Sequence, residues 1–397
     1  MNVLAEPIRR EFGLTDLQIG LLTGLAFAVL NVGLGLWVAR LAERMRRLTF
    51  VAIGTFLWSV ATAACGIAGT FGQLALARIS VGVGEAVGLP ASQSLVADCF
   101  PPERRTSAMA VLQLAPPLGA FIGSAGGAMI AEAAGWRTAF LLTAAPGFVL
   151  ALAVHLLLEE PPRGRFDGAT AGVAVPSLGE VLRRMWRQRG LRGVIAASTI
   201  ASLVGFGVNV FLAALLARRF GFGIGPAGVT AGLIASIPAT VSVLCGGWIA
   251  DRLGSARPRF YALVPGWSLL AAAPLYALAV TRGTPGWSIG LLAAAAVVQY
   301  SYLGPTYGVL QNLMQPRMRV SAAAVSAVFV SVVGAGLGPL CVGALSDHLA
   351  PHPGAHGNLP AALALMAIGY AVAGLLYLRV AGDLEADFAA ASAERGG

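Results

Sequence analysis

Long apolar runs separated by short polar segments repeat along the whole chain. Each run is long enough for an α-helix to cross a bilayer, which takes about 20 residues. The runs are too long for strands and do not alternate between apolar and polar positions, so they predict helices. The predicted spans cover residues 17–39, 48–69, 71–97, 107–131, 138–158, 191–217, 226–250, 260–281, 287–313, 320–345 and 361–381. The pattern therefore predicts an all-α membrane protein.

Charged residues are scarce and follow the predicted membrane boundaries. Only 11% of the residues are charged and 57% are hydrophobic, whereas soluble globular chains carry about 25% charged residues. Arginines gather after residues 39, 97, 158, 250 and 313, in segments that lie on one side of the membrane. The positive-inside rule places these segments and the polar C-terminus in the cytoplasm. The net charge of +9 thus follows the membrane and predicts no nucleic acid partner.

The two halves of the chain repeat each other. At an offset of 208, Phe12-Gly13, Gly20, Gly24 and Glu43-Arg44 match Phe220-Gly221, Gly228, Gly232 and Asp251-Arg252, and at an offset of 214 Arg105 matches Arg319. Such a period predicts duplicated multi-helix units, as in many secondary transporters. At the first offset Met1 falls on Asn209, inside the sixth span. We therefore expect eleven spans of twelve, with about 18 residues absent from the first helix.

This repeat divides the chain into four predicted parts. Residues 1–158 form an incomplete N-terminal bundle with five full spans, and residues 191–381 form a C-terminal six-helix bundle. Residues 159–190 form a cytoplasmic linker, and residues 382–397 a cytoplasmic tail. In the linker, Ser177 followed by Glu180 matches a helix capping box. We expect a short basic helix on the cytoplasmic membrane surface; a disordered linker is the alternative.

Two charged residues lie at membrane depth in the third span. Arg78 and Glu85 are seven residues apart, which places them on one helix face about two turns from each other. A charge at the bilayer centre costs roughly 3 kcal/mol on insertion scales, so such residues face a protein interior or a water-filled cavity. The alternative to a transport role is a structural ion pair, between the two residues or with another helix.

Other polar residues within the spans are candidates for a substrate cavity. Gln299, Tyr302 and Tyr307 lie at near-helical spacing on the ninth span, and Gln113 and Asn209 lie on the fourth and sixth. Each could instead form a hydrogen bond between helices, worth under ~1 kcal/mol.

Glycines recur at every fourth position in two spans. They occupy positions 119, 123 and 127 of the fourth span, and positions 334 and 338 of the tenth. Small residues at this spacing allow close approach of helix backbones. We therefore expect tight helix contacts at both places.

The sequence lacks two common catalytic motifs. It contains no HExxH or GxxxxGK[ST] pattern. His348, His352 and His356 recur every fourth residue, a spacing that could bind a metal on a helix. However, Pro351 and Pro353 interrupt this segment, which favours a solvated loop. We expect neither an enzyme nor a metal or other cofactor.

Several stretches are distinctive enough to compare with known families. They are ARLAERMRR at 39–47, LARISVGVGEAVGLPASQSLVADCFPPERRTSAMA at 76–110, GWRTAF at 135–140, PGF at 146–148, GGWIADR at 246–252 and GLGPLCVGALSD at 336–347. Together they resemble the major facilitator superfamily and, within it, the bacterial spinster-like transporters. The resemblance implies the major facilitator fold, in which two six-helix bundles rock around a central cavity, and a multi-pass monomer in the bacterial inner membrane.

The same resemblance implies roles for particular residues. Arg78 and Glu85 match an intramembrane Arg and Glu of spinster-like proteins, where the Glu is protonated and released during transport. In those relatives an Asp-Arg pair on the first helix joins this coupling, and that helix has no counterpart here. The first cytoplasmic loop motif of the superfamily has a Gly and an Asp four residues apart. Its predicted gate residues here are Ala39, Glu43 and Arg44, and those of its second copy are Gly247, Asp251 and Arg252.

These features predict secondary active transport of a small organic solute by alternating access, coupled to protons. The solute could be amphipathic, lipid-like or anionic, and the other partners are membrane lipids and the coupling proton. One alternative is a truncated remnant without transport activity, or a membrane sensor. A less favoured alternative is a polytopic membrane enzyme, which would turn over substrate in detergent without a gradient.

Overall fold

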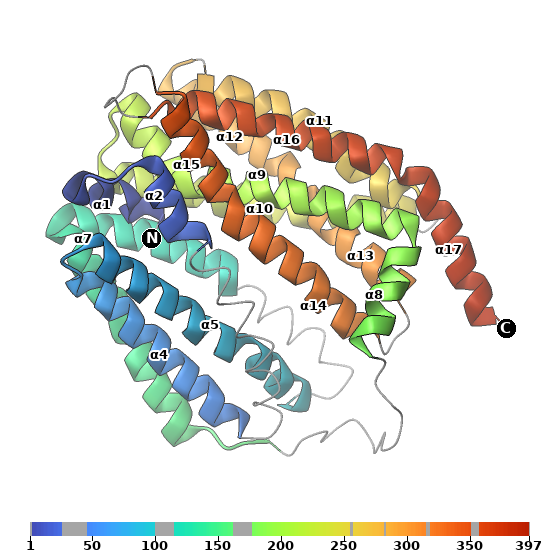
Figure 1. Cartoon of the computed structure of the whole chain (residues 1–397), viewed down its shortest axis with the longest axis horizontal. Coiled ribbons are helices and arrows are strands. Elements are labelled where there is room, and N and C mark those ends of the chain that lie inside the picture. The colour runs from blue at the N-terminus through green and yellow to red at the C-terminus, as the bar shows by residue number, and fades with distance from the viewer. Residues whose placement is uncertain are drawn as a thin grey trace. The chain divides into compact units, whose positions relative to one another are not determined.

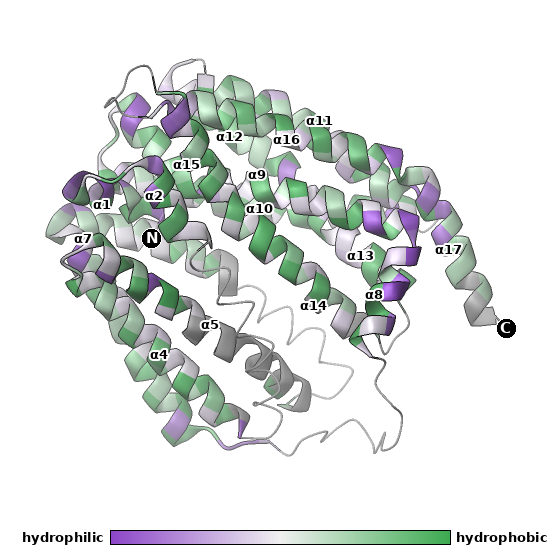
Figure 2. Cartoon of the chain, viewed as in Figure 1, coloured by the Kyte–Doolittle hydropathy of each residue, from purple (hydrophilic) through white to green (hydrophobic). Residues whose placement is uncertain are grey.

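The described helices follow the predicted spans. A computed structural model describes residues 2–25, 46–99, 115–161, 177–254, 257–281, 283–314, 318–350 and 357–396. Within these ranges the chain forms helices and no strand, and eight of the helices are long and apolar enough to cross a membrane. Hydrophobic residues cover most of their length (Figure 2). The all-α prediction is thus confirmed, while the count of eleven spans stays a prediction.

The N-terminal elements begin with a short helix pair and continue with long helices (Figure 1). They are η1 (Asn2–Leu4), α1 (Ala5–Phe12), α2 (Asp16–Gly20), η2 (Leu21–Leu25), α4 (Arg47–Ile67), α5 (Phe71–Cys99) and α7 (Ala115–Leu157). The run of α7 holds two predicted spans and is broken at Gly135, whose φ of 85° lies in the left-handed region that favours glycine.

The C-terminal elements begin with the linker helix and end with a helical tail. They are α8 (Leu178–Arg187), α9 (Arg189–Phe220), α10 (Ile224–Gly254), α11 (Phe260–Thr281), α12 (Pro285–Gln299), η3 (Tyr300–Tyr302), α13 (Leu303–Leu313), α14 (Arg319–Phe329), η5 (Val330–Leu337), α15 (Gly338–His348), α16 (Leu359–Arg379) and α17 (Ala381–Gly396).

The chain forms two compact units that exchange short segments. Unit 1 comprises Met1–Leu14, Leu21–Val173 and Gly221–Gly232. Unit 2 comprises Thr15–Gly20, Ala174–Phe220 and Leu233–Gly397. Two short segments thus belong to one unit while the residues before and after them belong to the other. They are Thr15–Gly20, in unit 2, and Gly221–Gly232, in unit 1. At the repeat offset of 208, Thr15–Gly20 corresponds to Gly223–Gly228, so the two exchanged segments are equivalent in the repeat.

In unit 1, α4 packs against both α5 and α7. Gly84 on α5 permits this approach, since a Cβ there would lie 2.6 Å from the backbone nitrogen of Trp58. In unit 2, α9 is largely buried and packs against η5, α15 and α16, while α11 packs against α12 and α16. A Cβ at Gly338 would lie 2.3 Å from the carbonyl oxygen of Leu203 on α9. The expected tight contact at the second glycine pair is therefore confirmed.

The linker and the tail both carry helices. Ser177 and Glu180 form the expected capping box, since the Ser177 Oγ accepts from the Glu180 backbone N–H at 3.3 Å and the reciprocal bond is 3.0 Å. In the tail helix α17, Asp387 accepts hydrogen bonds from the backbone N–H groups of Gly190 at 2.8 Å and Leu191 at 3.3 Å. The tail is therefore fastened to the first turn of α9.

A carboxylate on α1 joins α1 to α7 within unit 1. Trp136 Nε1 donates to Glu11 Oε2 at 2.6 Å, and Arg137 donates to Glu11 Oε1 at 2.6 Å. Arg137 also donates to the carbonyl of Ala68 at 3.1 Å, just past the end of α4. These bonds from Trp136 and Arg137 hold the pKa of Glu11 below its usual value of 4.5.

This carboxylate predicts a pH-dependent contribution to stability. Because the folded pKa of Glu11 is lowered, its stabilisation is complete above pH 4.5 and is lost as the pH falls through the folded value. The Glu11 side chain is 43% exposed, so solvent screening limits the contribution to about 1 kcal/mol. Thermal unfolding in detergent should show Glu11→Gln less stable than wild type at pH 6, with a gap that shrinks towards pH 3.5. A gap independent of pH would contradict this assignment.

Candidate functional site

The ninth and tenth spans are interrupted within the membrane segment. The ninth changes from α12 to the 3₁₀-helix η3 at Tyr300, and the tenth changes from α14 to the π-helix η5 at Val330. Pro305 explains the first break, because proline removes a backbone donor and clashes with the carbonyl four residues earlier. Pro339 lies in the first turn of α15, where it has the same effect on the end of η5. Broken membrane helices are typical of transporter binding sites.

Buried polar side chains gather beside the break in the ninth span. Tyr370 on α16 donates to the side-chain oxygen of Gln299, and Ser202 on α9 shares a hydrogen bond of 3.0 Å with Tyr302. Gln299 and Tyr302 are only 3% and 4% exposed. Both therefore connect helices inside unit 2, which favours the helix-to-helix interpretation of these two candidates over a cavity lining.

Two other candidates remain accessible. Asn209 on α9 is half-buried and donates to the hydroxyl of Tyr300, which is also half-buried. Tyr307 on α13 is 46% exposed. Among the described residues near this break, Asn209, Tyr300 and Tyr307 are thus polar groups that are not fully buried.

The intramembrane Arg and Glu lie on one uninterrupted helix. Arg78 and Glu85 both belong to α5, and Arg78 is half-buried. The Glu85 side chain lies outside the described part of the structure, as does the whole of Gln113. The expected common helix face follows from the helix itself, while the role of each residue stays a prediction.

The second gate motif lies on α10. Helix α13 packs closely against it. A Cβ at Gly304 on α13 would lie 3.0 Å from the Cα of Gly247. Arg252 is exposed, with its guanidinium 5.4 Å from the ring centroid of Trp248. The side chain of Asp251 is outside the described part. Outside it entirely are the first gate motif, Ala39, Glu43 and Arg44, and the loop residues His352 and His356.

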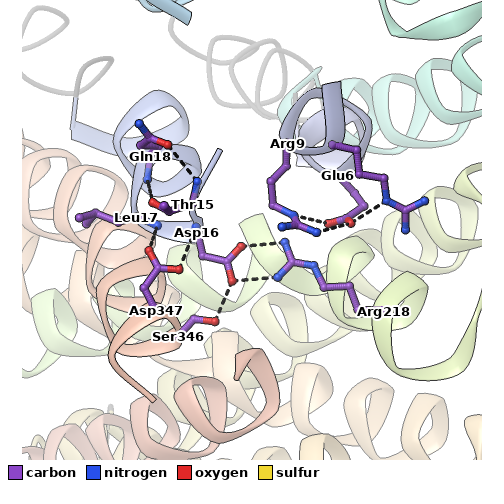
Figure 3. A network of polar contacts seen from close by, with 10 residues as sticks. Glu6, Arg9, Thr15, Asp16, Leu17, Gln18, Arg218, Ser346 and Asp347 are labelled. Carbon is purple, nitrogen blue, oxygen red and sulfur yellow. Dashed lines mark hydrogen bonds and ion pairs between the residues drawn. The ribbon is translucent and has the colours of Figure 1, made fainter. Parts of the chain in front are cut away.

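A network that the sequence did not predict surrounds the start of α2. The carboxylate of Asp347, near the end of α15, accepts from the backbone N–H of Asp16 at 3.0 Å and of Leu17 at 2.8 Å (Figure 3). Thr15 and Gln18 form a capping box with bonds of 2.9 and 3.2 Å. The backbone N–H of Ile19 reaches the Thr15 carbonyl at 3.1 Å and forms the first internal bond of the helix. The four N–H groups before it, Thr15 to Gln18, which a helix leaves without an internal partner, are thus all satisfied.

The side chain of Asp16 forms the centre of this network. Arg218, near the end of α9, donates two bonds to its carboxylate at 2.7 and 2.8 Å, and Ser346 Oγ donates a third at 2.7 Å (Figure 3). The Asp16 side chain is 2% exposed and that of Arg218 is 15% exposed. A bidentate Arg–carboxylate pair in such a place is strong and geometrically specific. We call Asp16, Arg218, Ser346 and Asp347 the helix-end latch.

Glycines bring the backbones at the latch into contact. A Cβ at Gly20 would lie 2.4 Å from the carbonyl oxygen of Pro339, and a Cβ at Gly343 would lie 2.3 Å from that of Asp16. No larger residue fits at either position without moving α2 away from α15. The capping of α2 by Asp347 therefore depends on this close approach.

In unit 1 a carboxylate also lies beside the start of a helix, at the other exchanged segment. The carboxylate of Glu132 on α7 lies beside the start of α10, since a Cβ at Gly225 would lie 2.0 Å from Glu132 Oε2. A carboxylate is favourable at a helix N-terminus. The repeat offset of 214 pairs Glu132 with Ser346, the neighbour of Asp347. The repeat thus marks the same end of both spans as polar, but it does not identify the partners that form the latch.

Comparison with known proteins identifies the class. The profile of the Major Facilitator Superfamily matches residues 1–339, and the chain belongs to this family. It is therefore a multi-pass membrane protein that transports a small solute, and it is not an enzyme.

Within the family the chain is most informatively compared with spinster-like proteins. It is 33% identical to an MFS-type efflux pump of Mycolicibacterium smegmatis over 95% of this chain and 86% of that one. It is 24% identical to a probable sphingolipid transporter, spinster homolog 1 of Arabidopsis thaliana, over 86% of this chain and 74% of that one. The chain also superposes on a bacterial homologue of the human lysosomal transporter Spinster, with a TM-score of 0.87 and 26% identity. The match covers 97% of this chain and 93% of the homologue, which was crystallised in an inward-facing and unoccupied conformation. The spinster-like resemblance is confirmed.

Proposed function

We propose that this protein is a secondary active transporter that moves a small amphipathic or anionic organic solute by alternating access, coupled to protons at Glu85. The observation that carries this proposal is the exchange of repeat-equivalent segments between the two units. Thr15–Gly20 begins a span whose continuation belongs to unit 1, yet it is fixed in unit 2 by the helix-end latch. To leave unit 2, this segment would have to break the latch.

The chemistry of the latch suits a contact that forms and breaks. The latch consists of hydrogen bonds from backbone N–H groups and of an ion pair, and water can replace both kinds of interaction. Its closest contacts are made at glycines. By the positive-inside rule the latch lies at the outer end of the spans. The Spinster homologue of similar fold was crystallised inward-facing, a state that requires a closed outer end. We infer that the latch closes the outer side of the present chain.

Proton coupling is assigned to Glu85, with Arg78 as its partner or as a contact for an anionic group of the solute. Both lie on α5 about two turns apart, in a run that the sequence predicts to span the membrane. A carboxylate in such a position is costly unless it has a function or a partner. Glu85 would take a proton from the side with the higher proton concentration and release it on the other.

Proton movement in proteoliposomes tests this function. The purified chain is reconstituted with an internal pH-sensitive dye, and a sphingoid base, a lysophospholipid and a sugar acid are added in turn. We expect at least one solute to drive proton movement, and a proton gradient to drive accumulation of the same solute. A folded, inserted protein that moves neither protons nor any solute would support the remnant or sensor alternative.

A further inference from the structure

The linker helix α8 has an apolar face of which only half is covered by protein. Val181 and Met185 are 0% and 5% exposed and face the rest of unit 2, where α8 contacts α9 and α14. Leu178, Leu182 and Trp186, spaced four residues apart, are 54%, 44% and 69% exposed. At about 100° per residue these five side chains form one continuous face of the helix. One edge of that face is buried and the other is open.

Arginines border the open edge. Arg183 and Arg187 on α8 are exposed, as is Arg192 just beyond it, and the guanidinium of Arg192 lies 5.5 Å from the ring centroid of Trp186. The acid on α8, Glu180, is engaged in the capping box with Ser177. Nearby Asp387 on α17 is engaged in capping α9. The open edge is therefore apolar in its centre and cationic at its border.

The position of α8 places this edge at the membrane boundary. Only Gln188 separates α8 from α9, which is long and apolar enough to cross a membrane. Figure 1 shows α8 turning across the end of α9, and Figure 2 shows hydrophilic and hydrophobic residues side by side on it. A helix with this amphipathic pattern lies in the plane of the interface, with its apolar residues at the acyl boundary.

We propose that α8 is a binding surface for anionic phospholipids of the cytoplasmic leaflet. Leu178, Leu182 and Trp186 enter the boundary between headgroups and acyl chains, where tryptophan is favoured. Arg183, Arg187 and Arg192 bind the phosphate groups, because guanidinium matches phosphate oxygens bidentately. A free phosphate would use the arginines and leave the apolar edge exposed, so the complete surface fits a lipid. This surface is independent of the transport mechanism proposed above.

Quenching of Trp186 by brominated phospholipids tests the proposal. The full chain is placed in phosphatidylcholine nanodiscs that contain increasing fractions of brominated phosphatidylglycerol. The chain has seven tryptophans, so the difference between wild type and Trp186→Phe isolates the signal of Trp186. We expect quenching at low fractions of the anionic lipid, and the same fraction of brominated phosphatidylcholine should quench less.

Removal of the arginines should abolish that preference. Arg183→Gln/Arg187→Gln/Arg192→Gln should need more anionic lipid for half-maximal quenching, roughly fivefold for each arginine removed. The triple Arg→Lys variant should keep most of the preference, since it keeps the charges, and Arg257→Gln, an exposed arginine elsewhere, should match wild type. Thermal unfolding of each variant shows whether it folds.

Three results would overturn the proposal. Equal quenching by both lipids would mean ordinary contact with bulk lipid. An unchanged preference in the folded glutamine variant would mean that these arginines do not bind the headgroups. A Trp186 that neither lipid quenches would mean that protein covers this surface.

Discussion

Glu85→Gln is expected to abolish gradient-driven accumulation of the solute while leaving the protein inserted and folded. Glutamine has the shape of glutamic acid but cannot bind and release a proton at this position. One pH unit across the membrane corresponds to about 1.4 kcal/mol per proton. A transporter that moves one proton per solute can therefore accumulate its solute up to about tenfold under this gradient, and the variant should reach a ratio of about one. The measurement is uptake into proteoliposomes under an imposed pH gradient.

A matched substitution separates this effect from the general loss of a carboxylate. Glu159→Gln removes an exposed carboxylate after the end of α7, and it should accumulate solute like wild type. If Glu85 only forms a structural ion pair, Glu85→Gln should lower the yield of folded protein while each folded molecule still accumulates. Undiminished accumulation in the variant, under a maintained gradient, would remove Glu85 from the coupling mechanism.

The spans could be predicted from sequence because the bilayer sets a local requirement. Each span must satisfy its own backbone hydrogen-bonding groups, and it needs about 20 apolar residues to cross the bilayer. The predicted span 260–281 accordingly coincides with α11, and the predicted gap between two spans coincides with the break at Gly135. The capping box of α8 was predictable for the same reason, since both of its partners lie within three residues.

Glycine spacing predicted one close helix contact and failed to specify the other. Gly334 and Gly338 pack directly against α9. Among the described residues, no atom lies within 4 Å of a Cβ built at Gly119 or Gly123, and the nearest to one at Gly127 is Val3 Cγ2 at 4.0 Å. The spacing shows only that a helix could approach closely. Whether another helix lies there depends on the tertiary arrangement, which the local pattern does not contain.

The helix-end latch could not be predicted from local patterns because its members are far apart in sequence. Asp16, Arg218 and Asp347 each resemble an ordinary polar residue at the end of a span. Their significance comes from the helices that bring them together. Similarly, Gln299 and Tyr302 have the spacing of a cavity face but are bonded to α16 and α9. Only the structure distinguishes a polar residue that lines a cavity from one that joins two helices.

Arg218→Gln is expected to open the outer end of the transporter by weakening the latch. It leaves the Asp16 carboxylate, 2% exposed, without its cationic partner. Breaking one side of a buried ion pair costs roughly 3–5 kcal/mol, which corresponds to a shift of more than a hundredfold in a conformational equilibrium. If the latch holds the outer end closed, as proposed, its release returns Asp16 to water and removes this cost. We therefore expect the outer-closed state to lose most of its free-energy advantage over the outer-open state.

Cysteine labelling from outside measures that shift. Ile19 on α2 is 1% exposed, so Ile19→Cys, in a chain whose native cysteines are replaced, should react slowly with a membrane-impermeant maleimide. The reaction should accelerate by up to about a hundredfold when Arg218→Gln is added. Arg219→Gln is the matched control, because the neighbouring Arg219 donates to the carbonyl of Val280 on α11 and takes no part in the latch.

A double variant distinguishes the latch from a general loss of stability. Asp16→Asn/Arg218→Gln removes both charges and so leaves no unpaired buried carboxylate. If the latch acts through this ion pair, the double variant should be labelled more slowly than Arg218→Gln, since the two effects are coupled. Additive effects would show that the two residues act independently. Labelling in Arg218→Gln as slow as in Arg219→Gln would show that the ion pair does not hold the outer end closed.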